Sequence, residues 1–241
     1  MSKIPFYIGN LAACFVPGSK NRAHCRASVN LFLYRPKINA FIKQTYGERV
    51  HHIKFIRQRT LNRVVCLVND KYYVKIFRDV TNAQLKNFEF IANYVRPYIG
   101  VTIPRVIVDD RMPMYVCEKI AGRAIDDFNP SDVIKNEKKI HTQVKEIIAQ
   151  LQSIDVDAIP DNSQFNDSMQ TRTIEQPAAH PRRVLGHFDL NETNLFFDDD
   201  LNVCAVIDWD TLSIANNPDT DWRIFTKYWN RYKARVEKQQ A

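Results

Sequence analysis

The sequence predicts an α+β fold, and three patterns along the chain predict it. Two hairpin patterns rich in apolar residues flank one amphipathic helical pattern between residues 63 and 120. A long helical pattern follows at residues 132–154. Short strand patterns at residues 183–185, 195–197 and 203–207, of which the last two form a third hairpin, precede an aromatic helical segment. At 241 residues with 45% apolar content, the chain can bury one good core or two small lobes.

The first hairpin pattern comprises residues 63–68 and 71–77. They are joined at Asn69-Asp70, a pair that is typical of a tight turn. Lys75 lies inside the β-branched and aromatic second strand, where an ammonium group without a partner is energetically costly. Lys75 therefore needs either a partner or an orientation into water from an edge strand.

A helix is predicted at residues 81–95, where apolar residues recur at helical spacing. Glu89 lies on this helix, fourteen residues after Lys75. It can either pair with that lysine or lie on a solvated helix face. The second hairpin pattern follows at residues 103–108 and 114–120.

Three polar residues of the third hairpin region occur in an order that suits phosphoryl transfer. Asp189 lies in a polar loop, Asn194 follows five residues later, and Asp208 ends the apolar strand at 203–207. Asp189 can orient a hydroxyl group and accept its proton, while Asn194 and Asp208 supply hard oxygen ligands to Mg²⁺. The alternative is a solvated loop and hairpin rich in Asp and Asn, with its turn at residues 198–202.

Residues 184–210 resemble the catalytic core of the aminoglycoside phosphotransferase and choline kinase group, within the protein-kinase-like superfamily. That group carries a His-x-Asp-x-x-x-x-Asn loop, which His187, Asp189 and Asn194 match. It also carries an Ile-Asp-Trp/Phe/Leu metal strand, which residues 207–209 match.

Two details refine this resemblance. Phe188 stands where the group often has Gly or Asn. Residues 207–210, the Asn-Pro pair at 217–218 and the Asp-Trp pair that begins at Asp221 favour the choline/ethanolamine kinase branch. In that branch a second Asp, matched here by Asp221, typically braces the catalytic loop, and the resemblance implies that His187 braces it as well.

The resemblance implies a two-lobed protein-kinase-like fold. Residues 46–120 would form the N-lobe, a small antiparallel β-sheet with one helix. Residues 121–241 would form a mainly helical C-lobe that carries the catalytic loop and the metal site. A basic, partly apolar leader at residues 1–45 precedes both lobes.

The resemblance also implies where ATP binds. Lys75, held by Glu89, would bind the nucleotide phosphates. Residues 117–120 would be the hinge whose backbone reads adenine, so Cys117 and Lys119 are predicted to bind the cofactor. One departure from the family pattern is that no glycine-rich loop precedes Lys75, although backbone amides of the connector at 59–62 can still donate to phosphate.

Positive charge is concentrated at the start of the chain. Residues 1–60 contain eleven Lys and Arg and a single acid, Glu48, a net charge of +10, whereas the remainder carries −3. The apolar run at residues 4–16 is too short to span a bilayer, and only Lys3 precedes it without a convincing cleavage site, so no signal peptide is expected. The leader is either an interfacial anchor on an anionic membrane or a helix packed on the N-lobe.

The leader and the cysteines bear on the partners and the compartment. Residues 15–26 resemble the N-terminal leader of many bacterial surface-polysaccharide enzymes, which implies a lipid-linked glycan substrate and a role in lipopolysaccharide biosynthesis. Nucleic-acid binding is not expected, because no helix-turn-helix, RNA-binding fingerprint or interleaved aromatic platform is present. Five cysteines without zinc-binding spacing favour reduced thiols in a cytoplasmic protein, peripheral on the inner face of the membrane if the leader binds there.

The segment after Asp210 bears on the acceptor. Its thirty-one residues are fewer than the resembled kinases use to wall an acceptor pocket, which implies an open acceptor site. Phe225, Trp229 and Tyr232 recur at helical spacing, so they are predicted to form core rather than a cage for a quaternary ammonium.

Taken with the resemblance, these features predict an ATP- and Mg²⁺-dependent kinase. The predicted acceptor is a hydroxyl group of a sugar, a bacterial surface-glycan component or an amino-alcohol such as choline or ethanolamine. The alternative is a non-catalytic pseudokinase scaffold at a membrane surface or on a partner protein. The missing glycine-rich loop favours the scaffold, whereas the retained Lys, Glu, Asp, Asn and Asp set favours the enzyme.

Overall fold

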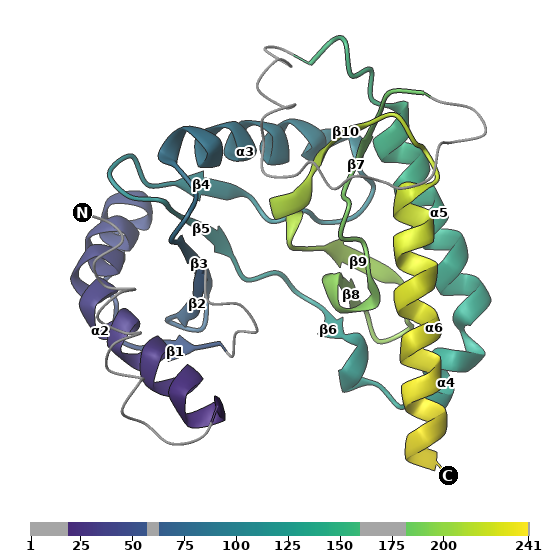
Figure 1. Ribbon diagram of the computed structural model, residues 1–241, viewed down its shortest axis with the longest axis horizontal. Helices are drawn as coiled ribbons and strands as arrows, with labels where there is room; N and C mark the ends of the chain where they lie inside the picture. Colours follow the sequence, from purple (N-terminus) through teal and green to yellow (C-terminus); the bar gives the residue numbers. More distant parts are fainter. Residues whose placement is uncertain (1–18, 57–62, 160–181, 241) are drawn as a thin grey trace. The chain divides into compact units, whose positions relative to one another are not determined.

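Figure 1 shows the computed structural model, which describes residues 19–56, 63–159 and 182–240. The chain divides into two compact units, one comprising Met1–Glu89 with Arg105–Lys119, the other Phe90–Pro104 with Ile120–Ala241. The last of the three boundaries between these units falls between Lys119 and Ile120, inside the predicted hinge. Residues 90–104, predicted as part of the N-lobe, group with the second unit.

The first unit is built on a five-stranded antiparallel sheet in the order β1-β2-β3-β5-β4. The strands are β1 Ile53–Phe55, β2 Arg63–Val68, β3 Tyr72–Phe77, β4 Val106–Val108 and β5 Met114–Glu118. The two predicted hairpins are therefore confirmed. Asn69 and Asp70 both adopt positive φ, 53° and 55°, as a two-residue type I′ turn requires.

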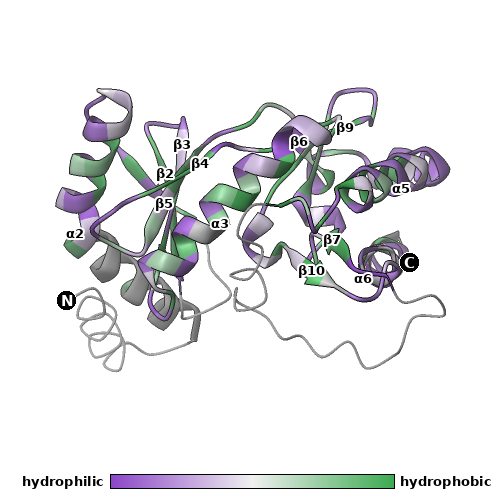
Figure 2. Cartoon of the chain, turned by 90° about the horizontal axis from the view of Figure 1, so that it is seen from above, coloured by the Kyte–Doolittle hydropathy of each residue, from purple (hydrophilic) through white to green (hydrophobic). Residues whose placement is uncertain are grey.

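Helix α2 (Ser19–Tyr46) covers one face of this sheet (Figure 1). Its residues Tyr34, Ile38 and Ile42 are fully buried at helical spacing and pack in one core cluster with β2, β3 and β5. Hydrophilic turns of α2 alternate with hydrophobic ones in Figure 2. From Tyr34 onward the leader packs as a helix on the sheet, which is one of the two alternatives for it, whereas the apolar run at residues 4–16 lies outside the described residues.

Helix α3 (Asn82–Val95) confirms the helix predicted at residues 81–95. It begins with a capping box. The Thr81 hydroxyl accepts the backbone N–H of Gln84, and the side-chain oxygen of Gln84 accepts the backbone N–H of Thr81. Phe88 of α3 and Phe77 of β3 both contact the ring of Tyr115 in β5, with centroids 5.4 and 5.7 Å away. The helix therefore packs on β3 and β5 through an aromatic cluster.

The second unit combines helices with two small antiparallel sheets, ordered β10-β7 and β6-β8-β9. Its helices are α4 Pro130–Lys135, α5 Glu137–Ser153 and α6 Thr220–Gln240, with short 3₁₀ turns η1 Arg96–Tyr98, η2 Ile125–Asp127, η4 Glu192–Asn194 and η5 Trp209–Thr211. Its strands are β6 Arg123–Ala124, β7 Val184–Gly186, β8 Leu195–Phe197, β9 Val203–Val206 and β10 Ser213–Ala215. The predicted β8–β9 hairpin is confirmed, while β7 pairs with β10.

Aromatic residues of α6 form much of the core of the second unit. Phe225 and Trp229 are fully buried and Tyr232 is nearly so, which confirms that they belong to the core. Trp229 donates its indole N–H to Glu137 of α5 at 2.7 Å. The two longest helices of this unit are therefore joined by packing and by a polar contact.

Two further observations concern cysteines and membrane spans. The four cysteines within the described part of the chain, Cys25, Cys66, Cys117 and Cys204, form no disulfide bond there, and burial raises the pKa of Cys66 to about 12. Within residues 19–56, 63–159 and 182–240, no helix is long and apolar enough to cross a bilayer.

Candidate functional site

The polar loop at residues 187–194 is anchored by Asp221 in the first turn of α6. One carboxylate oxygen of Asp221 accepts the backbone N–H of His187 at 2.8 Å, and the other accepts that of Phe188 at 2.7 Å. Only 3% of Asp221 is exposed. Burial raises its pKa, although His187 and the two N–H donors favour the charged form.

The close approach of Asp221 depends on the residues around the end of β7. A Cβ atom on Gly186 would lie 2.9 Å from a carboxylate oxygen of Asp221 and 2.8 Å from the ring of Phe188. Phe188 itself adopts a positive φ of 56°, a conformation that non-glycine residues rarely use. The backbone is therefore held in a sharp turn by buried hydrogen bonds.

His187 joins the loop to the end of β9. Its Nε2 lies 2.9 Å from the carbonyl oxygen of Ile207, and its Nδ1 accepts the backbone N–H of Asp189 at 3.3 Å. These contacts assign the neutral tautomer that carries its proton on Nε2. Thr211 donates to the His187 carbonyl at 2.6 Å, and the ring of Trp209 lies 4.6 Å from the imidazole.

The structure brings Asp189 and Asn194 together. The Asn194 amide nitrogen donates to the Asp189 carbonyl at 2.8 Å and contacts its carboxylate at 3.3 Å. Asn191 donates to the same carbonyl at 2.8 Å and accepts from Thr193. Because the Asn194 amide nitrogen faces Asp189, its side-chain oxygen is the atom that remains to ligate a cation.

Asp208 lies two residues after the strand β9, close to the predicted strand end, and its neighbour Ile207 is bound to the loop through the backbone. The N–H of Ile207 donates to the carbonyl of Asn194 at 2.9 Å. Asp208 has φ 61° and ψ 52°, the left-handed region, which costs a non-glycine residue roughly 1 kcal/mol or more. Such strain persists only where the surrounding structure enforces it, and it is concentrated at functional sites.

The chemistry of these donors suits Mg²⁺ bound together with phosphate. Among the described residues, no three His, Cys, Asp or Glu side chains are grouped so that they could hold a metal ion. Asn194 and Asp208 supply two hard oxygens, and Mg²⁺ commonly takes one or two protein carboxylates plus substrate phosphates. The set therefore fits a nucleotide-bound Mg²⁺ better than a permanent metal centre.

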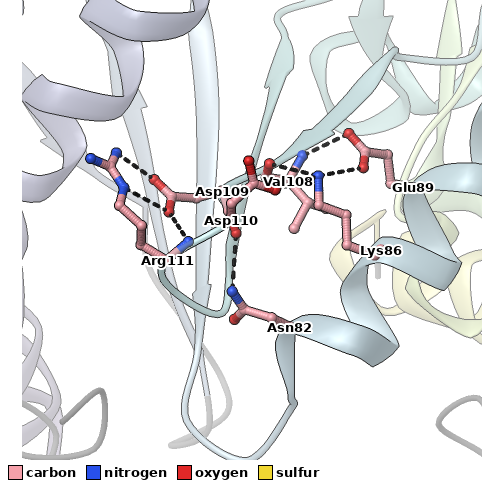
Figure 3. Close-up of polar contacts among 7 residues, drawn as sticks. All are labelled: Asn82, Lys86, Glu89, Val108, Asp109, Asp110 and Arg111. Atoms are coloured by element: carbon pink, nitrogen blue, oxygen red, sulfur yellow. Dashed lines mark hydrogen bonds and ion pairs between the residues drawn. The ribbon is translucent and has the colours of Figure 1, made fainter.

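In the first unit, Glu89 is engaged with neighbours other than the predicted one (Figure 3). It accepts the backbone N–H of Val108 at 2.9 Å and pairs with Lys86 at 3.1 Å, and Lys86 also pairs with Asp110 at 2.9 Å. Lys75 is half-buried on β3, with its ammonium 5.5 Å from the ring centre of Tyr115. The Lys75–Glu89 pair stays a prediction.

The hinge residues lie at the end of β5. Cys117 is opposite Tyr73 of β3 and Val106 of β4. The backbone N–H of Lys119 donates to the carbonyl of Lys71 at 2.6 Å, so this donor is engaged within the sheet. Adenine recognition by this segment stays a prediction, and the connector at residues 59–62 lies outside the described part of the chain.

Three residues of the loop network were missed by the sequence reasoning. Thr211 and Trp209 hold His187, and Asn191 holds the Asp189 carbonyl. The contact of Asn191 was predictable from the sequence, because Asn side chains commonly bond backbone groups two residues away. The contact of Thr211 was not predictable, because it spans twenty-four residues of sequence.

Comparison with solved structures identifies the class of fold. Similar structures include a ternary complex of APH(2″)-IIa with streptomycin and ATP, with a TM-score of 0.60 and 16% identity over 77% of this chain and 75% of that chain. Another is the macrolide 2′-phosphotransferase MphH from Brachybacterium faecium, with a TM-score of 0.53 and 13% identity over 82% of each chain. The chain thus has the predicted α+β, protein-kinase-like fold.

Comparison of sequences bears on the loop itself. Residues 166–216 match the phosphotransferase enzyme family, and this segment contains both the loop and Asp208. A search of curated protein sequences finds no match. The resemblance to the aminoglycoside phosphotransferase group is confirmed, in sequence for this segment and in fold for most of the chain.

Proposed function

We propose that this chain is a Mg²⁺- and ATP-dependent phosphotransferase that phosphorylates a hydroxyl group of a sugar or sugar-containing acceptor. The observation that carries the proposal is the loop at residues 187–194. Its catalytic and metal-binding candidates are held by a buried network that ends on Asp221. A solvated loop, the alternative reading of this sequence, needs no such network.

The residues of the second unit have distinct roles in this proposal. Asp189 accepts the proton of the acceptor hydroxyl at its carboxylate and orients that hydroxyl for in-line attack. Asn194 and Asp208 hold Mg²⁺ through their side-chain oxygens, while His187 and Asp221 keep the loop in place. When bound, MgATP supplies the transferable phosphoryl group and the positive charge that neutralises it.

The residues of the first unit serve the nucleotide. Lys75 binds the phosphates as a positive charge, and the backbone of residues 117–120 contacts adenine. Because the N–H of Lys119 already donates to Lys71, the remaining backbone groups of that segment must contact the base. Cys117 and Lys119 are therefore proposed to contribute backbone atoms rather than side chains.

The acceptor is proposed from the chemistry of similar proteins. Solved structures that resemble this chain include complexes of APH(2″) enzymes with streptomycin, gentamicin and kanamycin. This supports a hydroxyl group of a sugar-containing acceptor, while a surface glycan is suggested only by the resemblance of the leader. An amino-alcohol such as choline remains the second acceptor class to test, because residues 207–222 favoured it.

The first experiment is a calorimetric titration of MgATP into the full chain and its variants. Wild type is expected to bind only with Mg²⁺, and Asp208→Ala is expected to abolish or greatly weaken binding. Asp199→Ala, whose carboxylate is 91% exposed in the β8–β9 turn, is the matched control and should bind as wild type. Absence of binding by well-folded wild type would favour the non-catalytic scaffold instead.

Turnover is then measured with a panel of aminoglycosides, simple sugars, glycan fragments and amino-alcohols. Asp189→Ala should lower kcat by about 10²- to 10⁴-fold, the range typical of a lost general base, while MgATP still binds. Retained turnover in Asp189→Ala would contradict the assignment of this residue.

A further inference from the structure

Helix α2 carries an unusual charge for a helix that packs on a sheet. Within Ser19–Tyr46 there is no Asp or Glu. The six cations are Lys20, Arg22, Arg26, Arg35, Lys37 and Lys43. The chain beyond residue 60 has a net charge of −3, so this positive charge is local to the start of the chain.

The packing of α2 determines which side of its described part faces outward. Tyr34, Ile38 and Ile42 are fully buried against the sheet. The side chains at residues 35–37 and 43 lie away from this stripe and are exposed. The buried stripe therefore fixes the helix on the first unit and leaves Arg35, Lys37 and Lys43 in solvent.

Three of these cations have described side chains, and none of the three has an acidic partner among the described residues. Among the described residues, Arg35, Lys37 and Lys43 take part in no ion pair, and Lys37 contacts only the ring of Tyr34, at 5.8 Å. Nearby Phe32 is 76% exposed, the largest exposure among the large hydrophobic side chains described. Solvated cations near an exposed aromatic ring form a surface that is complementary to an anionic, partly apolar partner.

We propose that α2 docks this protein onto the surface of an anionic lipid membrane. The cations meet lipid phosphates, and Phe32 enters the boundary between headgroups and acyl chains. A duplex nucleic acid offers the same phosphates but no apolar layer for Phe32, whereas the bases of a single strand stack on aromatic rings, so the experiment below includes single-stranded RNA. This inference goes beyond the phosphotransferase proposal and holds whether or not the chain is catalytic.

The charge contribution predicts a measurable affinity. Each cation near an anionic surface contributes about 1 kcal/mol, which is roughly a fivefold change in partitioning. Removal of three described cations should therefore weaken binding by about a hundredfold. Binding should also fall with added salt, because salt screens interactions at a surface.

The experiment is sedimentation of the full chain with phosphatidylcholine vesicles, with and without phosphatidylglycerol. The test variant combines Arg35→Gln, Lys37→Gln and Lys43→Gln. The control variant combines Lys138→Gln, Lys227→Gln and Lys238→Gln, exposed positions on α5 and α6 that lower the net charge equally. Thermal unfolding of both variants verifies that they fold.

Binding of wild type only to the anionic vesicles, lost in the α2 variant and kept in the control, would support the proposal. Equal loss in both triple variants would overturn it, because general positive charge would then explain binding. Absence of vesicle binding together with α2-dependent binding of single-stranded RNA would also overturn it and identify a nucleic-acid partner.

A second pair of variants tests the apolar contact. Phe32→Gln should weaken binding to anionic vesicles even at high salt. Phe90→Gln, a substitution of the exposed aromatic residue on α3, should leave it unchanged. Equal binding by Phe32→Gln and wild type would overturn the insertion of Phe32.

Discussion

The loop at residues 187–194 and the surroundings of Glu89 were both predicted from polar residues at family-like spacing, yet they differ in the structure. In the loop, the predicted residues contact one another: Asp221 accepts the backbone N–H of His187, and the Asn194 side chain donates to the Asp189 carbonyl. In the first unit, Glu89 contacts Lys86 and Val108.

The difference between the two regions shows that a sequence motif predicts contacts within one loop more reliably than contacts between separate elements. Asp189 and Asn194 are five residues apart within one turn, so their contact follows from local backbone geometry. Glu89 has a competing cation three positions earlier on its own helix and a backbone donor on β4. A predicted pair between two elements must compete with every nearer donor, and sequence spacing does not reveal those donors.

The largest expected effect comes from removing the anchor of the loop. Asp221→Ala leaves two buried N–H groups without an acceptor, so we expect a loss of about 3–5 kcal/mol in the free energy of unfolding. Urea denaturation measures it, with Asp199→Ala as the exposed control. A loss below about 1 kcal/mol would mean that the network does not hold the loop.

A smaller effect is expected from filling the space beside the same carboxylate. Gly186→Ala places a Cβ against Asp221 and Phe188, so it should destabilise the protein by about 1–3 kcal/mol. Gly100→Ala is the control, because the added Cβ would meet only the flexible side chain of Gln150. Equal stability of the two variants would show that the backbone near Gly186 shifts freely.

His141 provides a contrast with the fully partnered His187. Its Nε2 is buried without a hydrogen bond among the described residues, and it is surrounded by aromatic residues of α6. Burial lowers its pKa below the ordinary 6.5, Glu137 opposes this, and Lys233 and Lys145 add to it. A lowered folded-state pKa means that stability is present above pH 6.5 and is lost as the pH falls below it.

His141→Phe removes this titration, so its free energy of unfolding should decline less than that of wild type from pH 7.5 to 5. Urea denaturation at several pH values is the measurement. His51→Gln, at an exposed histidine, should keep the wild-type slope. An unchanged slope in His141→Phe would assign the pH dependence to other groups.

The smallest expected effect concerns the pairing of Glu89. A double-mutant cycle with Lys86→Ala and Glu89→Ala should give a coupling energy of about 0.3–1 kcal/mol, typical of a partly exposed helix pair. The pair Asp132–Lys135 is more exposed and longer, at 3.8 Å, so it should give a smaller coupling energy. The affinity for MgATP provides a second test of this pairing. An equal loss of that affinity in Glu89→Ala and Lys75→Ala would show that Glu89 supports Lys75 when the nucleotide binds.

Much of the fold was predictable because its elements follow local rules. The Asn69-Asp70 turn, the helix at residues 81–95 and the β8–β9 hairpin were all predicted from turn residues or periodicity. Strands β1, β6 and β10 were not predicted; each has two or three residues and lies outside the predicted hairpins. The predicted helix at 132–154 is divided at Asn136 into α4 and α5.

The sequence by itself determined the hairpins, the amphipathic helices and the identity of the residues that carry the proposed chemistry. Only the tertiary structure decided which atoms hold those residues. The two N–H groups that Asp221 accepts, the Thr211 contact to His187 and the partners of Glu89 all join separate elements. Local conformation depends on neighbours along the chain, whereas a hydrogen bond between elements depends on how the whole core packs.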